Sequence, residues 1–232
     1  MTDTIRERII SAIVTALAAV RTANGYATEA GAAVYRCEVA LDPESAPFLN
    51  VFPQPETVEH DRYGNPVHTM PVIIEAVAEF DETPSEVAEQ LLGDLIECGT
   101  GVVYYLPFTG GKSEIKAGDT ITGATSGATA YVSAVSVTSG AWAELNAAGT
   151  LTLKRLAKVF QTEALNVGAV ASASTTGAIT GQYPEARMTA GLADSIRYTA
   201  GGVSEYPHRD KHLTGQQITL EIVYTTSPGN PY

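Results

Sequence analysis

The feature that most constrains the fold of this chain is a change of composition in its middle. Residues 103–187 are rich in Gly, Ala, Ser and Thr, whereas both flanks carry helical and strand patterns. The charges divide in the same way: six Lys and Arg against five Asp and Glu in the middle, a balance of +1, and eight against twenty-one in the flanks, a balance of −13. The sequence therefore predicts one acidic domain, 1–102 together with 188–232, that carries an inserted β domain at 103–187.

Two helices are predicted in the acidic domain. Apolar residues recur from Ile5 to Val20 at steps of three and four, Thr4 and Glu7 fit a capping box, and Asn24-Gly25 is a typical helix end. The second helix has a clearer start, because the run 83–86 (Thr-Pro-Ser-Glu) places a cap residue before a proline and a glutamate. Its apolar stripe follows: Val87, Leu91, Leu92, Leu95 and Ile96.

Five strands are predicted around these helices from alternating or continuous apolar runs. They cover residues 34–41, 48–52, 72–80, 196–203 and 217–225, with a polar hairpin tip at 59–66. In the last strand Ile218, Leu220, Ile222 and Tyr224 fall on one face. The economical packing is an α+β fold in which a mixed or antiparallel sheet has two helices on one face.

The middle stretch reads as short β pieces separated by glycine turns. This pattern is typical of a small all-β barrel or sandwich, and low complexity is the alternative for a segment so rich in Ala and Gly. Spaced apolar residues favour the folded reading, because they could supply a core: Ile121, Tyr131, Val135, Trp142 and Leu151.

Length and composition limit the functional classes. No apolar run reaches the eighteen or so residues of a membrane helix, and the N-terminal pattern with Asp3, Arg6 and Glu7 is unlike a signal peptide. We therefore expect no membrane association and a protein made in a cytosol. Cys37 and Cys98 are too few and too far apart for a disulfide framework or a zinc motif, and we expect two buried free thiols.

The strong negative charge, −12 at pH 7 with a pI near 4.7, argues against a surface that grips phosphate. It is compatible with a surface past which DNA slides without adhering.

Few residues suggest metal binding. The run 208–212 holds two histidines four apart, but Pro207 and Gly215 favour a loop, where helical spacing has no meaning. His60, Asp61 and His68 flank the hairpin tip and are weighed in the same way. Solvated loops are the preferred reading of both groups, and no metal site is predicted.

No complete catalytic or nucleotide-binding motif is present. Gly111-Lys112-Ser113 matches the end of a phosphate-binding loop, but Leu106 stands where the opening glycine belongs and Gly118 leaves no room for a following helix. The pair Asp81-Glu82 suits a helix N-terminus, and Glu75 and Glu79 suit the wet face of a strand. We predict no catalytic residues, no cofactor and no enzymatic activity.

The order and texture of the flanking elements resemble those of tail terminator proteins of long-tailed bacteriophages. The likeness rests on the N-terminal amphipathic helix, the strand 48–52, the hairpin ending in 70–74, the helix 87–96 and the closing strand 217–224. It covers about residues 1–100 and 188–232. The insert departs from the plain family pattern, although its run 123–130 (Gly-Ala-Thr-Ser-Gly-Ala-Thr-Ala) resembles small β modules of phage structural proteins.

The resemblance implies a structural virion protein in the neck of the tail, assembled in the host cytoplasm. Such proteins form a homo-oligomeric ring, commonly a hexamer, that caps the head-proximal end of the tail tube, ends tube growth and joins the tail to the head connector. Its partners would be the tail tube protein and a head-completion protein. Genome DNA would cross the lumen without specific binding, and we expect acidic residues of the flanks to line that channel.

Two other readings stay open. The first is another phage neck or tail component, such as a head–tail joining protein or a tube subunit. The second is a soluble enzyme or a carbohydrate-binding module whose insert holds the ligand. In that module Tyr104, Tyr105, Tyr131 and Trp142 could stack on sugar rings, although core and interface positions are the preferred reading of these aromatics.

Overall fold

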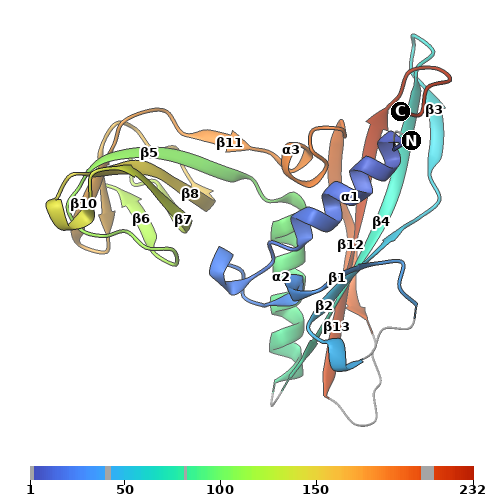
Figure 1. Ribbon diagram of the computed structural model, residues 1–232, viewed down its shortest axis with the longest axis horizontal. Coiled ribbons are helices and arrows are strands. Elements are labelled where there is room, and N and C mark those ends of the chain that lie inside the picture. The colour runs from blue at the N-terminus through green and yellow to red at the C-terminus, as the bar shows by residue number, and fades with distance from the viewer. Residues whose placement is uncertain (1–2, 40–42, 81–82, 205–211) are drawn as a thin grey trace. The chain divides into compact units, whose positions relative to one another are not determined.

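A computed structural model describes residues 3–39, 43–80, 83–204 and 212–232 (Figure 1). The fold is α+β, with three α-helices and two separate sheets in the described residues. The chain divides into two compact units. The first, called here the α+β unit, contains residues 1–22, 26–100 and 184–232; the second, called the β module, contains residues 23–25 and 101–183.

The α+β unit is built on a six-stranded sheet in the order β1-β2-β4-β13-β12, with β3 paired to β4 beside β2. The strands are β1 (Val34–Arg36), β2 (Phe48–Pro53), β3 (Thr57–His60), β4 (Pro66–Glu79), β12 (Ser195–Ser204) and β13 (Leu213–Thr225). All pairs are antiparallel except β1 with β2, so the sheet is mixed. The long pair of β4 and β13 runs in unbroken register from Glu79 opposite Leu213 to Val67 opposite Thr225.

Two helices cover one face of this sheet. They are α1 (Ile5–Leu17) and α2 (Pro84–Thr100), which lie on the same side of the strands in Figure 1. Their apolar stripes pack against alternate residues of β4 and β13 in one cluster that includes Ile13, Leu91, Ile74 and Leu220, all fully buried. The short helix α3 (Pro184–Met188) adds Met188 to the same cluster. The predicted arrangement of two helices on one face of the sheet is confirmed.

Helix ends and one buried carboxylate fix the helices in place. Thr4 caps α1 by accepting a hydrogen bond from the Glu7 amide at 3.2 Å. In α2, Asp94 is 2% exposed and accepts hydrogen bonds from the amides of Ala27 and Thr28 and from the Thr28 hydroxyl, at 2.7–2.9 Å. Because all three donors converge on one buried carboxylate, the loop after α1 is held against α2.

The β module is a small barrel. Its sheet order is β10-β9-β6-β7-β8-β5-β11, and an additional pairing of β10 with β5 closes six of the seven strands on themselves. The strands are β5 (Val103–Gly111), β6 (Thr120–Gly123), β7 (Thr129–Ser139), β8 (Ala147–Ala157), β9 (Ala164–Val167), β10 (Val170–Thr175) and β11 (Thr180–Gln182). A separate core fills it, with Leu106, Ile121, Val132, Leu151 and Leu153 fully buried. The module is therefore folded and not a low-complexity segment.

The Glu163 side chain stabilises the turn of the β module that contains Thr125 and Ser126. Its carboxylate accepts hydrogen bonds from the amides of Thr125, Ser126 and Gln161 and from the Ser126 hydroxyl, at 2.5–3.0 Å. Burial by itself would raise the pKa of Glu163, but these donors outweigh it and lower the pKa to about 2. The Gly-Ala-Thr-Ser-Gly-Ala run singled out in the sequence is thus a turn built around a buried carboxylate.

Several element ends differ from the sequence predictions. The first helix ends at Leu17 and not at Asn24-Gly25, and Val20 packs in the core from the following turn. The strand predicted over 34–41 ends at Arg36 because Cys37 has a φ of +54°, which breaks the extended backbone; its last residues, 40 and 41, lie outside the described residues. Residues 57–60 form β3, so the hairpin tip is shorter than 59–66.

The β module covers Gly101–Tyr183 with residues 23–25, whereas the sequence prediction for the insert was 103–187; residues 184–187 belong to α3 in the α+β unit. The described residues also contain four short 3₁₀ helices: Thr22–Asn24, Ala30–Ala32, Pro43–Ser45 and Trp142–Glu144.

Candidate functional site

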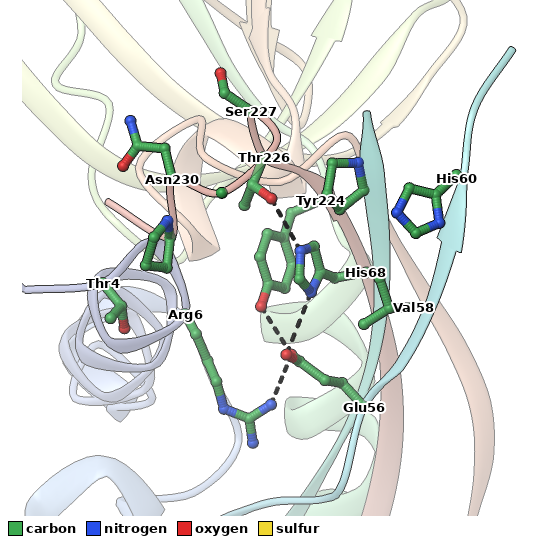
Figure 2. A pocket seen from close by; sticks show the side chains of 13 residues that line it. Thr4, Arg6, Glu56, Val58, His60, His68, Tyr224, Thr226, Ser227 and Asn230 are labelled. Atoms are coloured by element: carbon green, nitrogen blue, oxygen red, sulfur yellow. Dashed lines mark hydrogen bonds and ion pairs between the residues drawn. The ribbon is translucent and has the colours of Figure 1, made fainter. Parts of the chain in front are cut away.

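The candidate site is a pocket of about 470 Å³ in the α+β unit (Figure 2). Its walls come from the start of α1, the strands β3 and β4, the end of β13 and the C-terminal turn at 227–231. The turn is tied to the helix because the Ile5 amide donates to the Pro231 carbonyl at 2.9 Å. Segments from both ends of the chain therefore meet at this pocket.

Glu56 lies at the centre of the polar groups in the pocket, just before β3. Its Oε2 atom accepts hydrogen bonds from the Arg6 guanidinium and the Tyr224 hydroxyl, each at 2.7 Å. Its Oε1 atom lies 3.2 Å from Nδ1 of His68. Arg6 also donates to the Gln54 carbonyl at 3.1 Å. Figure 2 shows these side chains converging from α1, β4 and β13 on one carboxylate.

The His68 ring joins this cluster to the C-terminal turn. Its Nε2 atom lies 3.0 Å from the Thr226 hydroxyl, and the ring stacks on Tyr224 with centroids 4.6 Å apart and planes 7° from parallel. A neutral ring with its proton on Nδ1 satisfies both contacts, because it then donates to Glu56 and accepts from Thr226. Both ring nitrogens of His68 and one face of its ring are thus engaged within the protein.

The electrostatics of the pocket follow from these contacts. Partial burial would raise the pKa of Glu56, but the hydrogen bonds from Tyr224 and Arg6 and the charge of Arg6 outweigh burial and lower it. For Tyr224, burial and then the neighbouring Glu56 raise the pKa above its usual range. The carboxylate stays ionised and the phenol stays protonated at neutral pH. Because three side chains from α1, β4 and β13 converge on the Glu56 carboxylate, this network acts as a clamp that joins these elements.

A second feature of the α+β unit is the sheet face away from the helices. Register places Glu75 and Glu79 of β4 and Glu221 of β13 on this face, since they alternate with the buried Ile74, Ala78 and Leu220. Arg197 of β12 is paired in register with Glu221 and lies 4.0 Å from its carboxylate. Apart from this arginine, the charged residues that register places here are acidic within the described strands β4, β12 and β13.

The residues predicted around the hairpin are partly brought together. His60 and His68 line the pocket, whereas Asp61 closes the hairpin tip by accepting from the amides of Tyr63 and Asn65, both at 2.8 Å. Asp61 therefore has a structural role in the turn. Among the described residues, no group of three or more His, Cys, Asp or Glu side chains is placed to hold a metal ion.

Other predicted residues lie elsewhere or cannot be placed. Asp81, Glu82 and residues 208–211 are outside the described residues; His212 is described, and its ring packs edge-on against Phe80 at 5.4 Å. Cys98 is buried as expected, but the expectation for Cys37 was wrong: it is exposed, because the left-handed residue that ends β1 leaves the core side of the sheet.

The module residues with suggested chemistry have structural surroundings. The amides of Lys112 and Ser113 both donate to the Ser172 carbonyl, at 2.7 and 3.3 Å, so this segment is tied into the barrel and no helix follows it. Trp142 stacks on Phe108 with centroids 5.2 Å apart, and Tyr105 donates to the Gln182 side chain at 2.9 Å. Tyr131 packs under the Arg155 guanidinium at 5.3 Å, and Tyr104 is half-buried against the core.

Sequence reasoning missed the pocket itself. Arg6, Glu56 and Tyr224 are separated by 50 and 168 positions, and each sits in a locally unremarkable pattern. One residue could have indicated the pocket from the sequence. Tyr224 lies at the end of the apolar face of a predicted strand, and a buried tyrosine hydroxyl requires a hydrogen-bond partner nearby.

The comparisons with known proteins give no identification: no family model and no curated protein matches the chain. Among the described helices, none combines the length and the apolar character needed to cross a membrane.

Proposed function

We propose that this protein is a structural subunit of a phage tail, a terminator that forms a ring on the head-proximal end of the tail tube. The ring would end tube polymerisation and join the tail to the head connector. The observation that carries the proposal is the asymmetry of the α+β unit: helices cover one sheet face, and the other face carries Glu75, Glu79 and Glu221. A ring subunit needs such a face for the lumen, where negative charge keeps DNA from adhering.

The described element order agrees with the resemblance on which the proposal rests. An N-terminal amphipathic helix precedes β2, the β3–β4 hairpin and α2, and β13 closes the sheet beside β4. The β module enters after α2 and returns before α3, and its first and last strands pair with each other, Val103 opposite Gln182. Because the two ends of the module are adjacent, the module is an insertion, and the strands of the α+β sheet pair with one another without it.

Electron microscopy of the purified full-length protein, combined with its mass in solution, tests the proposal. A terminator forms discrete closed rings, of which six subunits is the expected number, and does not extend them. Long polymers formed by the protein alone would favour the alternative of a tube subunit.

The second candidate function is carbohydrate binding by the β module. The favouring observation is a shallow pocket of about 430 Å³ bordered by Trp142, Val137 and the ion pair of Glu114 and Lys116. Hits on a glycan array that disappear in a folded Trp142→Ala variant would support this function, and an array without hits would remove it.

A further inference from the structure

Two edges of the α+β sheet are open within the described residues. β12 ends the strand order on one side. On the other side β1 ends the strand order, and β3 pairs only with β4. All four residues of β3 are exposed, and from Arg197 to Val203 only Gly202 of β12 is less than exposed. An open edge presents unpaired backbone donors and acceptors, which is the usual template for adding a strand from another chain.

The directions of these edge strands suit each other. β12 is antiparallel to β13, β13 is antiparallel to β4, and β4 is antiparallel to β3. β12 and β3 therefore run in opposite directions. When one copy is related to the next by rotation about an axis along the strands, β12 of one copy meets β3 of its neighbour in antiparallel orientation. This contact uses two different surfaces, so it closes into a ring when the rotation angle allows.

The side chains match on both faces of such a joined sheet. Tyr198 is paired in register with Leu220 and Val58 with His68, so both lie on the helix-covered face. Tyr198 is 39% exposed and Val58 is 48% exposed, and Val58 borders the pocket around Glu56. The pocket thus offers space beside β3 for an aromatic side chain from a neighbouring copy.

The charges match on the other face. Arg197 is paired with Glu221 and Glu59 with Val67, which places both Arg197 and Glu59 away from the helices. Glu59 is exposed, and the side chain of Arg197 is 69% exposed with only a 4.0 Å contact to Glu221. The joined edges would bring these opposite charges together.

The remaining edge strand, β1, is a poorer partner for β12. It has three residues and is followed by Cys37 with its positive φ. Its one charged residue is Arg36, which is already paired with Glu7 of α1 at 2.5 Å. Register with Val51 and Ile74 places Arg36 on the helix-covered face, so it offers no charge to Arg197 on the other face.

The geometry points to a subunit interface in which β12 of one copy adds to the β3 edge of the next, with Tyr198 entering the pocket around Glu56 and Arg197 pairing with Glu59. The occupant of each edge is a second copy of this chain. This inference rests on the proposed function, because it assigns the contacts that would close the proposed ring.

Reciprocal charge reversal in the full-length protein tests the interface. Arg197→Glu and Glu59→Lys each place like charges across the contact, and each should weaken assembly about tenfold or more, measured as the concentration at which rings dissociate. The double variant restores opposite charges and should recover most of that loss. Glu89→Lys, at an exposed position of α2, makes the same charge change as Glu59→Lys away from the contact and should leave assembly unchanged.

A second measurement guards against misfolding and identifies the residues directly. In a Cys37→Ser background, the pair Arg197→Cys and Glu59→Cys should form a disulfide between copies under oxidation, whereas either single cysteine should not close a ring covalently. Rings that form normally in all charge variants, with no such cross-link, would overturn the interface and leave the proposed ring intact. A wild-type protein that forms polymers in place of rings would overturn the proposed function itself.

Discussion

The two units of this protein differ in whether their sheets are closed or have open edges. The β module closes six strands into a barrel, so its backbone donors and acceptors are used internally. The α+β unit leaves β3 and β12 open and one sheet face without helices. The barrel leaves few strand edges for other chains, whereas the open edges of the α+β unit are where we propose that other copies assemble. The charge follows the same division, with the acidic excess residing outside the insert.

The largest effect on stability is expected from removing one buried side chain from either hydrophobic core. The two substitutions should affect different units. Leu91→Ala in α2 and Leu151→Ala in β8 each remove a fully buried side chain from a different cluster. Each should lower the free energy of unfolding of its own unit by ~2–5 kcal/mol. Hydrogen exchange, read amide by amide, should show the loss confined to the unit that carries the change. The exposed Leu145→Ala serves as control; loss of protection throughout the chain from either core variant would mean that the units fold as one.

Glu56→Gln should destabilise the α+β unit and leave the β module unchanged. The variant loses charge-assisted hydrogen bonds from Arg6 and Tyr224, so we expect ~1.5–3 kcal/mol of destabilisation in urea unfolding. Because the pKa of Glu56 is lowered in the folded state, its contribution is present above the ordinary value of 4.5 and decreases as pH falls below it. Glu89→Gln on exposed α2 is the matched control. Equal stability of the two variants would contradict the clamp.

Glu163→Gln should have the reciprocal effect on the β module, by ~1–3 kcal/mol. The folded-state pKa of about 2 lies below the ordinary 4.5, so this carboxylate stabilises the module above pH 4.5 and ceases to do so as pH falls toward 2. The wild-type module should therefore lose stability across that range, and the variant should lose less. The exposed Glu114→Gln should follow the wild type. Parallel pH curves for wild type and Glu163→Gln would show that the turn does not depend on this carboxylate.

The smallest effect on stability is expected at the open sheet face. Replacing Glu75, Glu79 and Glu221 with Gln together should change the free energy of unfolding of the α+β unit by under ~1 kcal/mol. The same variant should retain DNA that the wild type does not, in a filter or gel-shift assay at low salt, because three charges that repel phosphate are gone. A triple variant that retains no more DNA than the wild type would mean that this sheet face does not line the lumen.

Much of the fold was predictable from sequence because its local signals agree with its packing. The capping sequence at Thr83–Glu86 and the alternation from Ile218 to Tyr224 lead directly to α2 and β13. The end of β1 was not predictable, because the positive φ of Cys37 has no local sequence signal. The pocket was missed for a different reason. It joins Arg6, Glu56, His68 and Tyr224 through contacts between distant segments, and periodicity within a window carries no information about such contacts.

The most direct test of the account is a cryo-electron microscopy map of the assembled full-length protein. We expect a closed ring whose lumen is lined by the helix-free sheet face, with Glu75, Glu79 and Glu221 toward the channel and α1 and α2 on the outer side. A ring whose channel is lined by the helices, or by basic or apolar side chains, would contradict it.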